Sequence, residues 1–142
     1  MVDFSGNMYA LGSPPGDDGW WVAVRNPSRT EAVLGTVQLR DKGISSSGSY
    51  EKFIELGGVR YGHILSPRTL KPVEGVFGTT VVAPSAALAD GYSTAAYVLG
   101  KDALSFLEKE DGVEGVVVLR AEDGSGQFLA TKEWKRLCLG EP

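Results

Sequence analysis

Two side chains with hard oxygen atoms stand four residues apart in the segment Ala89-Asp90-Gly91-Tyr92-Ser93-Thr94-Ala95. On a helix, this spacing places the Asp90 carboxylate and the Thr94 hydroxyl on one face, over neighbouring turns. Two such oxygens suit Mg²⁺, which leaves its other positions to water and to substrate phosphates. The same spacing also occurs on helices where the Asp is solvated and the Thr bonds to a carbonyl one turn earlier. The pair alone leaves both interpretations open.

A second candidate is His63, the only histidine of the chain, in the segment Arg60-Tyr61-Gly62-His63-Ile64-Leu65-Ser66-Pro67-Arg68-Thr69. It stands at the end of an expected strand, just before a proline turn. Imidazole exchanges a proton near neutral pH, so His63 is the natural catalytic candidate for taking a proton from an attacking hydroxyl. The plainer alternative is a histidine that hydrogen-bonds a backbone carbonyl at a strand end.

Two further segments offer groups to an anionic cofactor. The run Ser46-Ser47-Gly48-Ser49-Tyr50 can present hydroxyls and backbone N–H groups, although a plain β-turn explains it equally well. The planar guanidinium of Arg68, next to Thr69, suits a phosphate, or it is a solvated turn residue. Ser47, Gly48, Arg68 and Thr69 are therefore the candidate cofactor-binding residues.

The order of these segments resembles the FAD:protein FMN transferases, a family once labelled thiamine-biosynthesis lipoproteins. The matching motifs are, in chain order, Ser5-Gly6-Asn7-Met8-Tyr9-Ala10-Leu11-Gly12, Gly48-Ser49-Tyr50-Glu51, the 60–69 segment, Val81-Val82-Ala83-Pro84 and the 89–95 segment. The similarity continues to about Thr131. Several short motifs in the right order are more specific than any one of them, and they correspond to the C-terminal half of that family.

The resemblance implies an enzyme that transfers FMN from FAD to a threonine of an acceptor protein in a magnesium-dependent reaction, releasing AMP. It assigns Asp90 and Thr94 to the metal and His63 to proton transfer. Family chains are considerably longer, and their N-terminal half carries many flavin contacts and a further metal ligand. We therefore expect half an active site with low metal affinity. Another part of the native polypeptide, a partner chain or a homodimer would complete it.

Three positions depart from the family pattern. Ser66 replaces the acid that usually follows the His-Ile-Leu sequence, Leu70 replaces the glycine of Arg-Thr-Gly, and Ser49 stands where Asp or Asn is common. These departures keep two alternatives open besides an enzyme. One is a non-catalytic flavin- or nucleotide-binding module derived from the family, and the other is a structural or interaction domain.

Composition predicts one globular domain over residues 1–142. A chain of 142 residues with 42% hydrophobic and 23% charged residues can bury a sizeable core. The net charge of −4 argues against a nucleic-acid partner, which would need a basic face. The single cysteine, Cys138, excludes an internal disulfide, and we expect it to be a small packing residue.

Localisation follows from the apolar runs and the family. The N-terminus Met1-Val2-Asp3-Phe4 lacks a signal-peptide pattern, and the longest apolar runs, such as Val116-Val117-Val118-Leu119, are strand-sized, which predicts a soluble chain. Family members are often exported and lipid-anchored, so the resemblance implies the cell envelope if this chain is part of an exported member.

The elements that must position these residues are mostly strands. Eight segments are rich in β-branched and aromatic residues and are bounded by Gly, Pro, Asp or Asn: 8–11, 20–25, 32–39, 50–56, 59–65, 77–82, 115–119 and 127–131. Gly57-Gly58 predicts a hairpin turn that brings His63 beside the Gly48-Ser49-Tyr50 segment.

Two successive helices are expected. The first begins after the N-cap Ser85, runs to Leu99 and stops at Gly100; the second runs from the cap Asp102 to about Lys109. Many strands with two helices predict an α+β fold built on a mainly antiparallel sheet.

Overall fold

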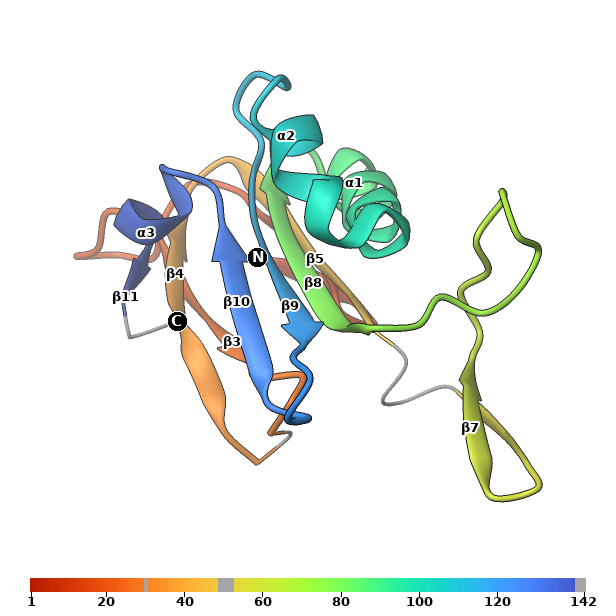
Figure 1. The fold of residues 1–142 in the computed structure, drawn as a ribbon. Helices are drawn as coiled ribbons and strands as arrows, with labels where there is room; N and C mark the ends of the chain where they lie inside the picture. The colour runs from red at the N-terminus through yellow and green to blue at the C-terminus, as the bar shows by residue number, and fades with distance from the viewer. Residues whose placement is uncertain (30, 49–52, 140–142) are drawn as a thin grey trace.

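The computed structural model describes residues 1–29, 31–48 and 53–139 (Figure 1). Its strands are β1 (Val2–Phe4), β2 (Asn7–Ala10), β3 (Trp20–Arg25), β4 (Val33–Leu39), β5 (Lys42–Gly48), β6 (Phe53–Leu56), β7 (Val59–Gly62), β8 (Val76–Ala83), β9 (Glu114–Arg120), β10 (Gly126–Ala130) and β11 (Cys138–Leu139). Its helices are α1 (Ala86–Leu99), a 3₁₀ turn (Gly100–Asp102), α2 (Ala103–Leu107) and α3 (Trp134–Leu137). The predicted α+β class is confirmed.

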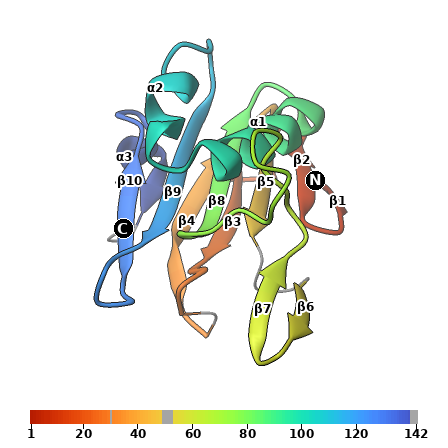
Figure 2. The same cartoon turned by 45° about the vertical axis from the view of Figure 1, so that its right-hand side comes forward.

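Six strands form the main sheet in the order β1-β2-β5-β8-β9-β10, and each neighbouring pair runs antiparallel. Helices α1 and α2 cover one face of this sheet, and the smaller β11-β4-β3 sheet covers the other (Figures 1 and 2). Side chains alternate between the two faces along each strand. Val116 and Val118 therefore pack toward the small sheet, while Val117 packs toward the helices.

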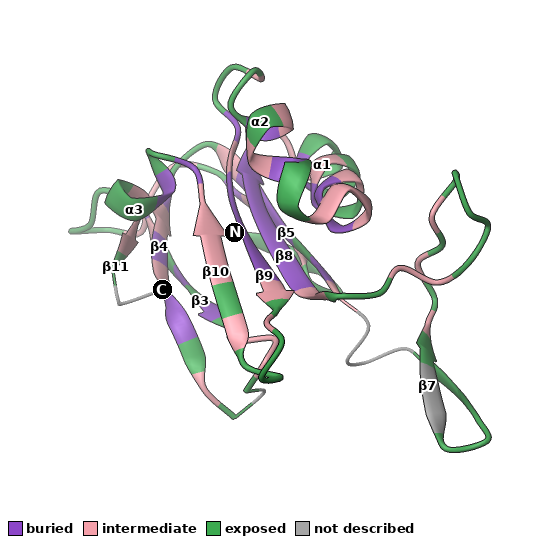
Figure 3. Ribbon diagram, in the orientation of Figure 1, coloured by how far each residue is buried: buried purple, intermediate pink, exposed green. Residues whose placement is uncertain are grey.

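Two apolar clusters result from this layering. The cluster between the sheets contains Ala10, Val22, Val24, Leu34, Val37, Leu39, Ile44, Val82, Val116, Val118 and Trp134. The cluster under the helices contains Val81, Ala83, Ala89, Ala96, Ala103, Leu107, Val113 and Val117. Figure 3 shows that buried residues gather on the central strands and on the inner side of α1. These clusters fix the position of α1 over the sheet.

Helix α1 begins and ends as predicted. The Ser85 backbone is extended, at φ −140° and ψ 158°, and its Oγ accepts a hydrogen bond from the Leu88 N–H at 3.2 Å. Gly100 ends the helix with φ 56°, and its N–H donates to the Ala96 carbonyl. Gly43 of β5 lies against the start of this helix, where an added Cβ would come within 2.4 Å of the Ala86 nitrogen. The first turn of α1 therefore packs directly on the β5 backbone.

The second helix is shorter than predicted, and Asp102 stands at the predicted N-cap position without capping the helix through its side chain. Asp102 makes no side-chain cap hydrogen bond because its backbone is already helical, at φ −86° and ψ −3°, as part of the 3₁₀ turn. An N-cap side chain reaches the helix N–H groups from an extended backbone. The two helices still follow one another, as predicted.

Strand β5 was not predicted, and the predicted turn at residues 46–50 is wrong for its described part. Residues 46–48 pair with β8 in the middle of the main sheet. The run Lys-Gly-Ile-Ser-Ser-Ser-Gly has one β-branched apolar residue, so it lacks the composition that indicates a strand. The remaining part of that run, and residues 50–52 of the predicted strand 50–56, lie outside the described residues.

Strands β6 and β7 form the predicted hairpin, with Leu56 opposite Val59. Gly57 and Gly58 both have positive φ, 60° and 79°, as a tight turn of this kind requires. The hairpin projects away from the layered part of the molecule (Figures 1 and 2). The segment after β7 returns toward α1 and contains an antiparallel bridge between Leu65 and Pro72.

Cys138 is half-buried on β11, opposite Val37 of β4. Burial raises the pKa of its thiol, which fits the predicted packing role. Across the described parts of the chain, no helix combines the length and the apolar character needed to cross a bilayer.

Candidate functional site

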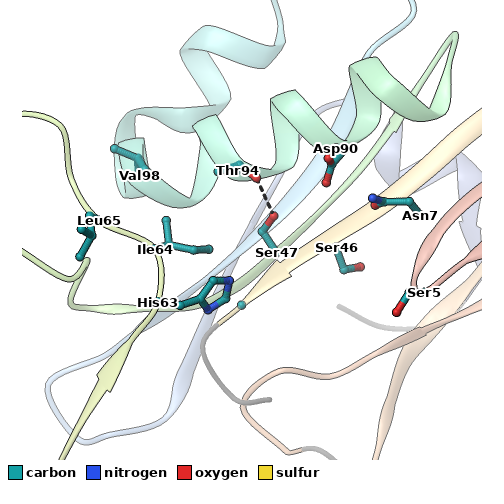
Figure 4. A pocket seen from close by; sticks show the side chains of 11 residues that line it. Ser5, Asn7, Ser46, Ser47, His63, Ile64, Leu65, Asp90, Thr94 and Val98 are labelled. Carbon is teal, nitrogen blue, oxygen red and sulfur yellow. Dashed lines mark hydrogen bonds between the residues drawn. The ribbon is translucent and has the colours of Figure 1, made fainter. Parts of the chain in front are cut away.

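A cavity of about 490 Å³ lies between α1, the serine-rich strand β5 and the segment that follows β7 (Figure 4). This volume is within the range of small-molecule sites in proteins. The residues that line it are Ser5, Asn7, Ser46, Ser47, Gly48, His63, Ile64, Leu65, Asp90, Thr94 and Val98. Six of the lining side chains carry oxygen atoms, and these six come from three separate parts of the sequence.

Asp90, Thr94 and His63 line this one cavity, as their predicted roles require. Asp90 and Thr94 stand one turn apart on α1, and His63 approaches from the other side, just after β7 (Figure 4). Ser47 and Gly48 line the cavity as well. Five of the predicted site residues are therefore brought together from three segments.

The Thr94 hydroxyl belongs to a short chain of hydroxyl groups. Ser47 Oγ lies 3.2 Å from Thr94 Oγ1 and 2.8 Å from Ser93 Oγ, and Ser93 Oγ donates to the Asp90 carbonyl at 3.0 Å. Each hydroxyl has one proton to donate. If Ser93 donates to the carbonyl, then Ser47 donates to Ser93 and Thr94 donates to Ser47. The oxygen of Thr94 then keeps its lone pairs for the cavity.

The Asp90 carboxylate has a similar neighbour in Ser45, whose Oγ lies 3.4 Å from Asp90 Oδ1. Ser45 Oγ also contacts Asn7 Oδ1 of β2 in a short hydrogen bond. Ser45 and Ser47 are two residues apart on β5 and so point to the same face of the sheet. They bond Asp90 and Thr94, which are four residues apart on α1.

The distance along β5 from Ser45 to Ser47 is similar to the distance along α1 from Asp90 to Thr94. Two residues of a strand advance about 6.6 to 6.8 Å, and four residues of a helix advance about 6 Å. A strand and a helix that run side by side can therefore place two serines under two helix side chains in register. The contact of β5 with α1 at Gly43 sets this register, since it joins the first turn of the helix to the strand.

The charge of the cavity is set by Asp90. No lysine or arginine is among the described residues that line the cavity. Among the described lining residues, a phosphate ligand would therefore meet a carboxylate and no lysine or arginine. Because like charges repel, a bound cation would favour phosphate binding here.

The oxygen atoms present fit Mg²⁺ better than a transition metal. Among the described residues there is no group of three or more His, Cys, Asp or Glu side chains placed to hold a metal ion, which is the set that zinc usually needs. Mg²⁺ commonly takes one or two carboxylates and leaves its remaining positions to water and phosphate oxygens. One carboxylate and one hydroxyl with free lone pairs satisfy that pattern.

Arg68 and Thr69 are not among the residues that line the cavity. Both are exposed in a turn, where the Arg68 N–H donates to Ser66 Oγ at 3.3 Å and Thr69 Oγ1 accepts from the Lys71 N–H at 3.4 Å. Leu70 follows with φ 55°, a left-handed conformation that glycine adopts more readily. The structure therefore explains why a glycine would suit this position.

Comparison with known proteins identifies the family of the chain. The sequence profile described as the ApbE family matches residues 1–117. The chain belongs to the ApbE family. The family predicted from the motifs is thereby confirmed.

Two curated relatives of this ApbE-family chain are both named FAD:protein FMN transferase. The protein from Rhodobacter capsulatus is 35% identical over 136 residues, which are 95% of this chain and 25% of the relative. The protein from Salmonella typhimurium is 32% identical over 132 residues, which are 92% of this chain and 38% of the relative. The chain thus spans less than half the length of either relative.

Solved structures of ApbE proteins share the fold. The Thermotoga maritima ApbE protein superposes with a TM-score of 0.82 at 31% identity, over 93% of this chain and 42% of that one. The apo form of the Pseudomonas stutzeri flavinyl transferase ApbE gives 0.75 at 33% identity, over 95% and 42%. The layered arrangement described above is therefore the arrangement of this part of an ApbE protein.

Sequence reasoning missed several residues of this ApbE-family site. Ser45 was not singled out, Asn7 was noted only within a glycine-rich motif, and Ile64, Leu65 and Val98 were given no place in the site. The available signal was the alternation of Ser45 and Ser47, which indicates one face of a strand if the run is extended. That signal was hidden because the run was interpreted as a turn.

Proposed function

We propose that this chain supplies the metal-binding and proton-accepting part of a magnesium-dependent site that transfers FMN from FAD to a threonine of an acceptor protein. The relatives' names support flavin transfer, and the cavity supports the division of labour among residues. The observation that carries the proposal is the placement of Asp90 and Thr94 on one face of α1, opposite His63. The described residues that line this cavity include no lysine or arginine.

Asp90 and Thr94 would hold the Mg²⁺ through a carboxylate oxygen and a hydroxyl oxygen. When bound, the cation would neutralise charge on the pyrophosphate of FAD. If Ser93 donates to the Asp90 carbonyl, the Thr94 hydroxyl donates to Ser47, which leaves the Thr94 oxygen available as a ligand. Asp90 therefore offsets the cation's charge, and Thr94 fixes the direction from which the cation is held.

His63 would accept the proton of the attacking threonine hydroxyl. The hydroxyl oxygen bonds to the phosphorus on the flavin side, the bond from that phosphorus to the bridging oxygen breaks, and AMP leaves with that oxygen. The proton passes to His63 and then to solvent. With water in place of threonine, the same step releases FMN and AMP.

The rest of the site would come from the part of the ApbE fold that this chain does not span, in the same polypeptide, a partner chain or a second copy. Ser47 and Gly48 remain proposed cofactor-binding residues because they line the cavity. Arg68 and Thr69 would reach the cofactor only from the turn beside it. The chain by itself is then expected to show a transfer rate close to background.

The test is flavin transfer by the full-length protein with FAD, Mg²⁺ and an acceptor protein that carries the target threonine. Mass spectrometry of the acceptor measures covalently bound FMN, and AMP release measures FAD cleavage. We expect Asp90→Ala to reduce both by roughly 10² to 10³-fold, since a metal contributes several kcal/mol to such a step. Asp102→Asn is the matched control, because this exposed carboxylate caps nothing and lies away from the cavity.

An Asp90→Ala protein that transfers FMN at the wild-type rate would overturn the proposal. A wild-type protein that binds FAD tightly but releases no AMP with Mg²⁺ and acceptor would show a flavin-binding module in place of a transferase.

A further inference from the structure

Ser45 is 1% exposed, yet its hydroxyl stands between two polar side chains of other elements. Asn7 of β2 lies on one side in a short hydrogen bond, and Asp90 of α1 lies on the other, with 3.4 Å between Ser45 Oγ and Asp90 Oδ1. A buried hydroxyl on a strand has little rotational freedom once it is bonded. Ser45 therefore joins β2, β5 and α1 through one side-chain oxygen.

The proton count of this trio restricts how it can be bonded. Ser45 has one proton, and both Asn7 Oδ1 and Asp90 Oδ1 are acceptors. The oxygen and nitrogen of an asparagine amide are exchanged by turning the group over, which barely changes its shape. With the amide turned, the Asn7 NH₂ donates to Ser45, and Ser45 donates to Asp90. Both contacts of the Ser45 hydroxyl then have one donor and one acceptor.

We propose that Ser45, oriented by Asn7, is a positioning residue that holds the Asp90 carboxylate for a divalent cation. This inference rests on the proposed function. It assigns to Ser45, two residues before Ser47 on β5, a task for Asp90 that parallels the contact of Ser47 with Thr94.

The physical reason is the exposure of Asp90. Asp90 is an exposed helix side chain, and such a side chain samples several rotamers in water. A hydrogen bond to one of its oxygens from the buried Ser45 favours the rotamer that leaves the other oxygen directed at the cavity. Partners that orient a metal ligand in this way typically change metal affinity or activity by about 10 to 100-fold when removed.

The experiment is direct binding of Mn²⁺ alone to the full-length protein, followed by the loss of the free Mn²⁺ signal in electron paramagnetic resonance. We expect Ser45→Ala to raise the Mn²⁺ dissociation constant about tenfold. Thr79→Val is the matched control, because Thr79 is also buried on a neighbouring strand and donates to α1, at the Ser93 carbonyl, 2.8 Å away. The Thr79→Val substitution removes a similar hydrogen bond between the sheet and α1 without touching Asp90. The variant protein should therefore bind Mn²⁺ as the wild type does.

A second variant keeps the test decisive if Ser45→Ala is unstable. Asn7→Ala should also weaken Mn²⁺ binding, and the Asn7→Ala, Ser45→Ala double variant should bind Mn²⁺ no more weakly than Ser45→Ala, because Asn7 acts through Ser45.

Mg²⁺-dependent AMP release should show a higher half-saturating Mg²⁺ concentration in Ser45→Ala, with most of the rate recovered at saturation.

Two results would overturn the inference, and they differ from each other. If Ser45→Ala and Thr79→Val bind Mn²⁺ equally well while Asp90→Ala does not bind, Ser45 is a structural residue and the proposed function stands. If the wild type binds no Mn²⁺, both the positioning role and the metal part of the proposed function are wrong.

Discussion

Asp90 and Thr94 stand on a helix that packs on the main sheet, whereas His63 stands on the segment that leaves the projecting β6–β7 hairpin (Figure 2). Beneath the first pair, Ser45 and Ser47 are 1% and 9% exposed. His63 itself is exposed, Leu65 is 55% exposed, and Ile64 between them is half-buried. One side of the cavity is thus built from the core outward, and the other is carried by a surface segment.

This difference indicates how the two chemical tasks are divided. Holding a cation needs oxygen atoms at fixed positions, and buried hydrogen bonds from a sheet provide them. Accepting a proton from a large incoming partner needs access, and a surface segment provides it. We therefore expect changes on the helix side to alter metal binding and stability, and changes on the His63 side to alter turnover.

The largest effect is expected from His63→Ala in the full-length protein. Loss of a general base typically reduces the rate by about 10² to 10⁴-fold. FMN transfer should fall by that order, while the Mn²⁺ dissociation constant stays at the wild-type value. A parallel loss of Mn²⁺ binding would show that His63 belongs to the metal site. The assignment of metal binding to the helix side and of proton transfer to the His63 side would then be wrong.

Gly43→Ala should have the next largest effect, on stability. A Cβ at residue 43 would meet the backbone of Ser85 and Ala86 at 2.4 to 2.6 Å, so α1 must move away from β5. Overpacking of this kind costs about 1 to 3 kcal/mol. Urea unfolding should show this loss, and Mn²⁺ binding should weaken because Asp90 and Thr94 move with the helix.

Gly91→Ala is the matched control for that experiment. Gly91 lies on the exposed part of α1, and nothing is within 4 Å of an added Cβ. Alanine at such a helix position is expected to stabilise by about 0.5 to 1 kcal/mol. If Gly43→Ala were as stable as Gly91→Ala, the close contact of α1 with β5 would not determine the register of the site.

The sequence was sufficient to predict the helix side of the cavity in part. Ser85 and Gly100 are strong local signals for the ends of α1, and a spacing of four residues then places Asp90 and Thr94 together. Strand β5 could not be predicted, because serines gain their strand conformation from pairing with β2 and β8 and not from their own preference. The hydroxyls beneath the helix were therefore missed.

On the other side of the cavity, the sequence predicted the hairpin but not its distance from the core. Gly57 and Gly58 specify a tight turn locally, yet nothing local determines where a hairpin sits relative to a sheet. The sequence predicts Arg68 as a cofactor-binding residue because its guanidinium suits a phosphate, with Thr69 beside it. Both stand in the exposed turn at 66–70 and are not among the described residues that line the cavity. That residues 1–142 form one domain stays a prediction.

A smaller effect is expected from Ser66→Asp. Ser66 is half-buried in the turn three residues after His63, where the family usually has an acid. A carboxylate there would stabilise the protonated imidazole and raise AMP release by up to about fivefold, since partly exposed charge pairs contribute up to about 1 kcal/mol. An unchanged or lower rate would show that Ser66 is suited to this site as it is.

The smallest effect is expected from Leu70→Gly. Leu70 has φ 55° and is 79% exposed, so its side chain gains little from burial while its backbone is strained. Relief of a left-handed conformation offsets the entropy cost of glycine, and a net gain of about 0.5 to 1 kcal/mol in unfolding free energy follows. Leu70→Ala keeps the Cβ and should show no gain. If Leu70→Gly and Leu70→Ala were equally stable, the left-handed backbone at residue 70 would not be a source of strain.

The claim that Asp90 and Thr94 share one divalent cation is tested most directly by diffraction. Crystals of the full-length protein soaked in MnCl₂ should show an anomalous peak at about 2.0 to 2.2 Å from both Asp90 Oδ and Thr94 Oγ1, inside the cavity that His63 lines. No peak at that position in Mn²⁺-saturated crystals, or a peak elsewhere with Asp90 turned to bulk solvent, would contradict the account.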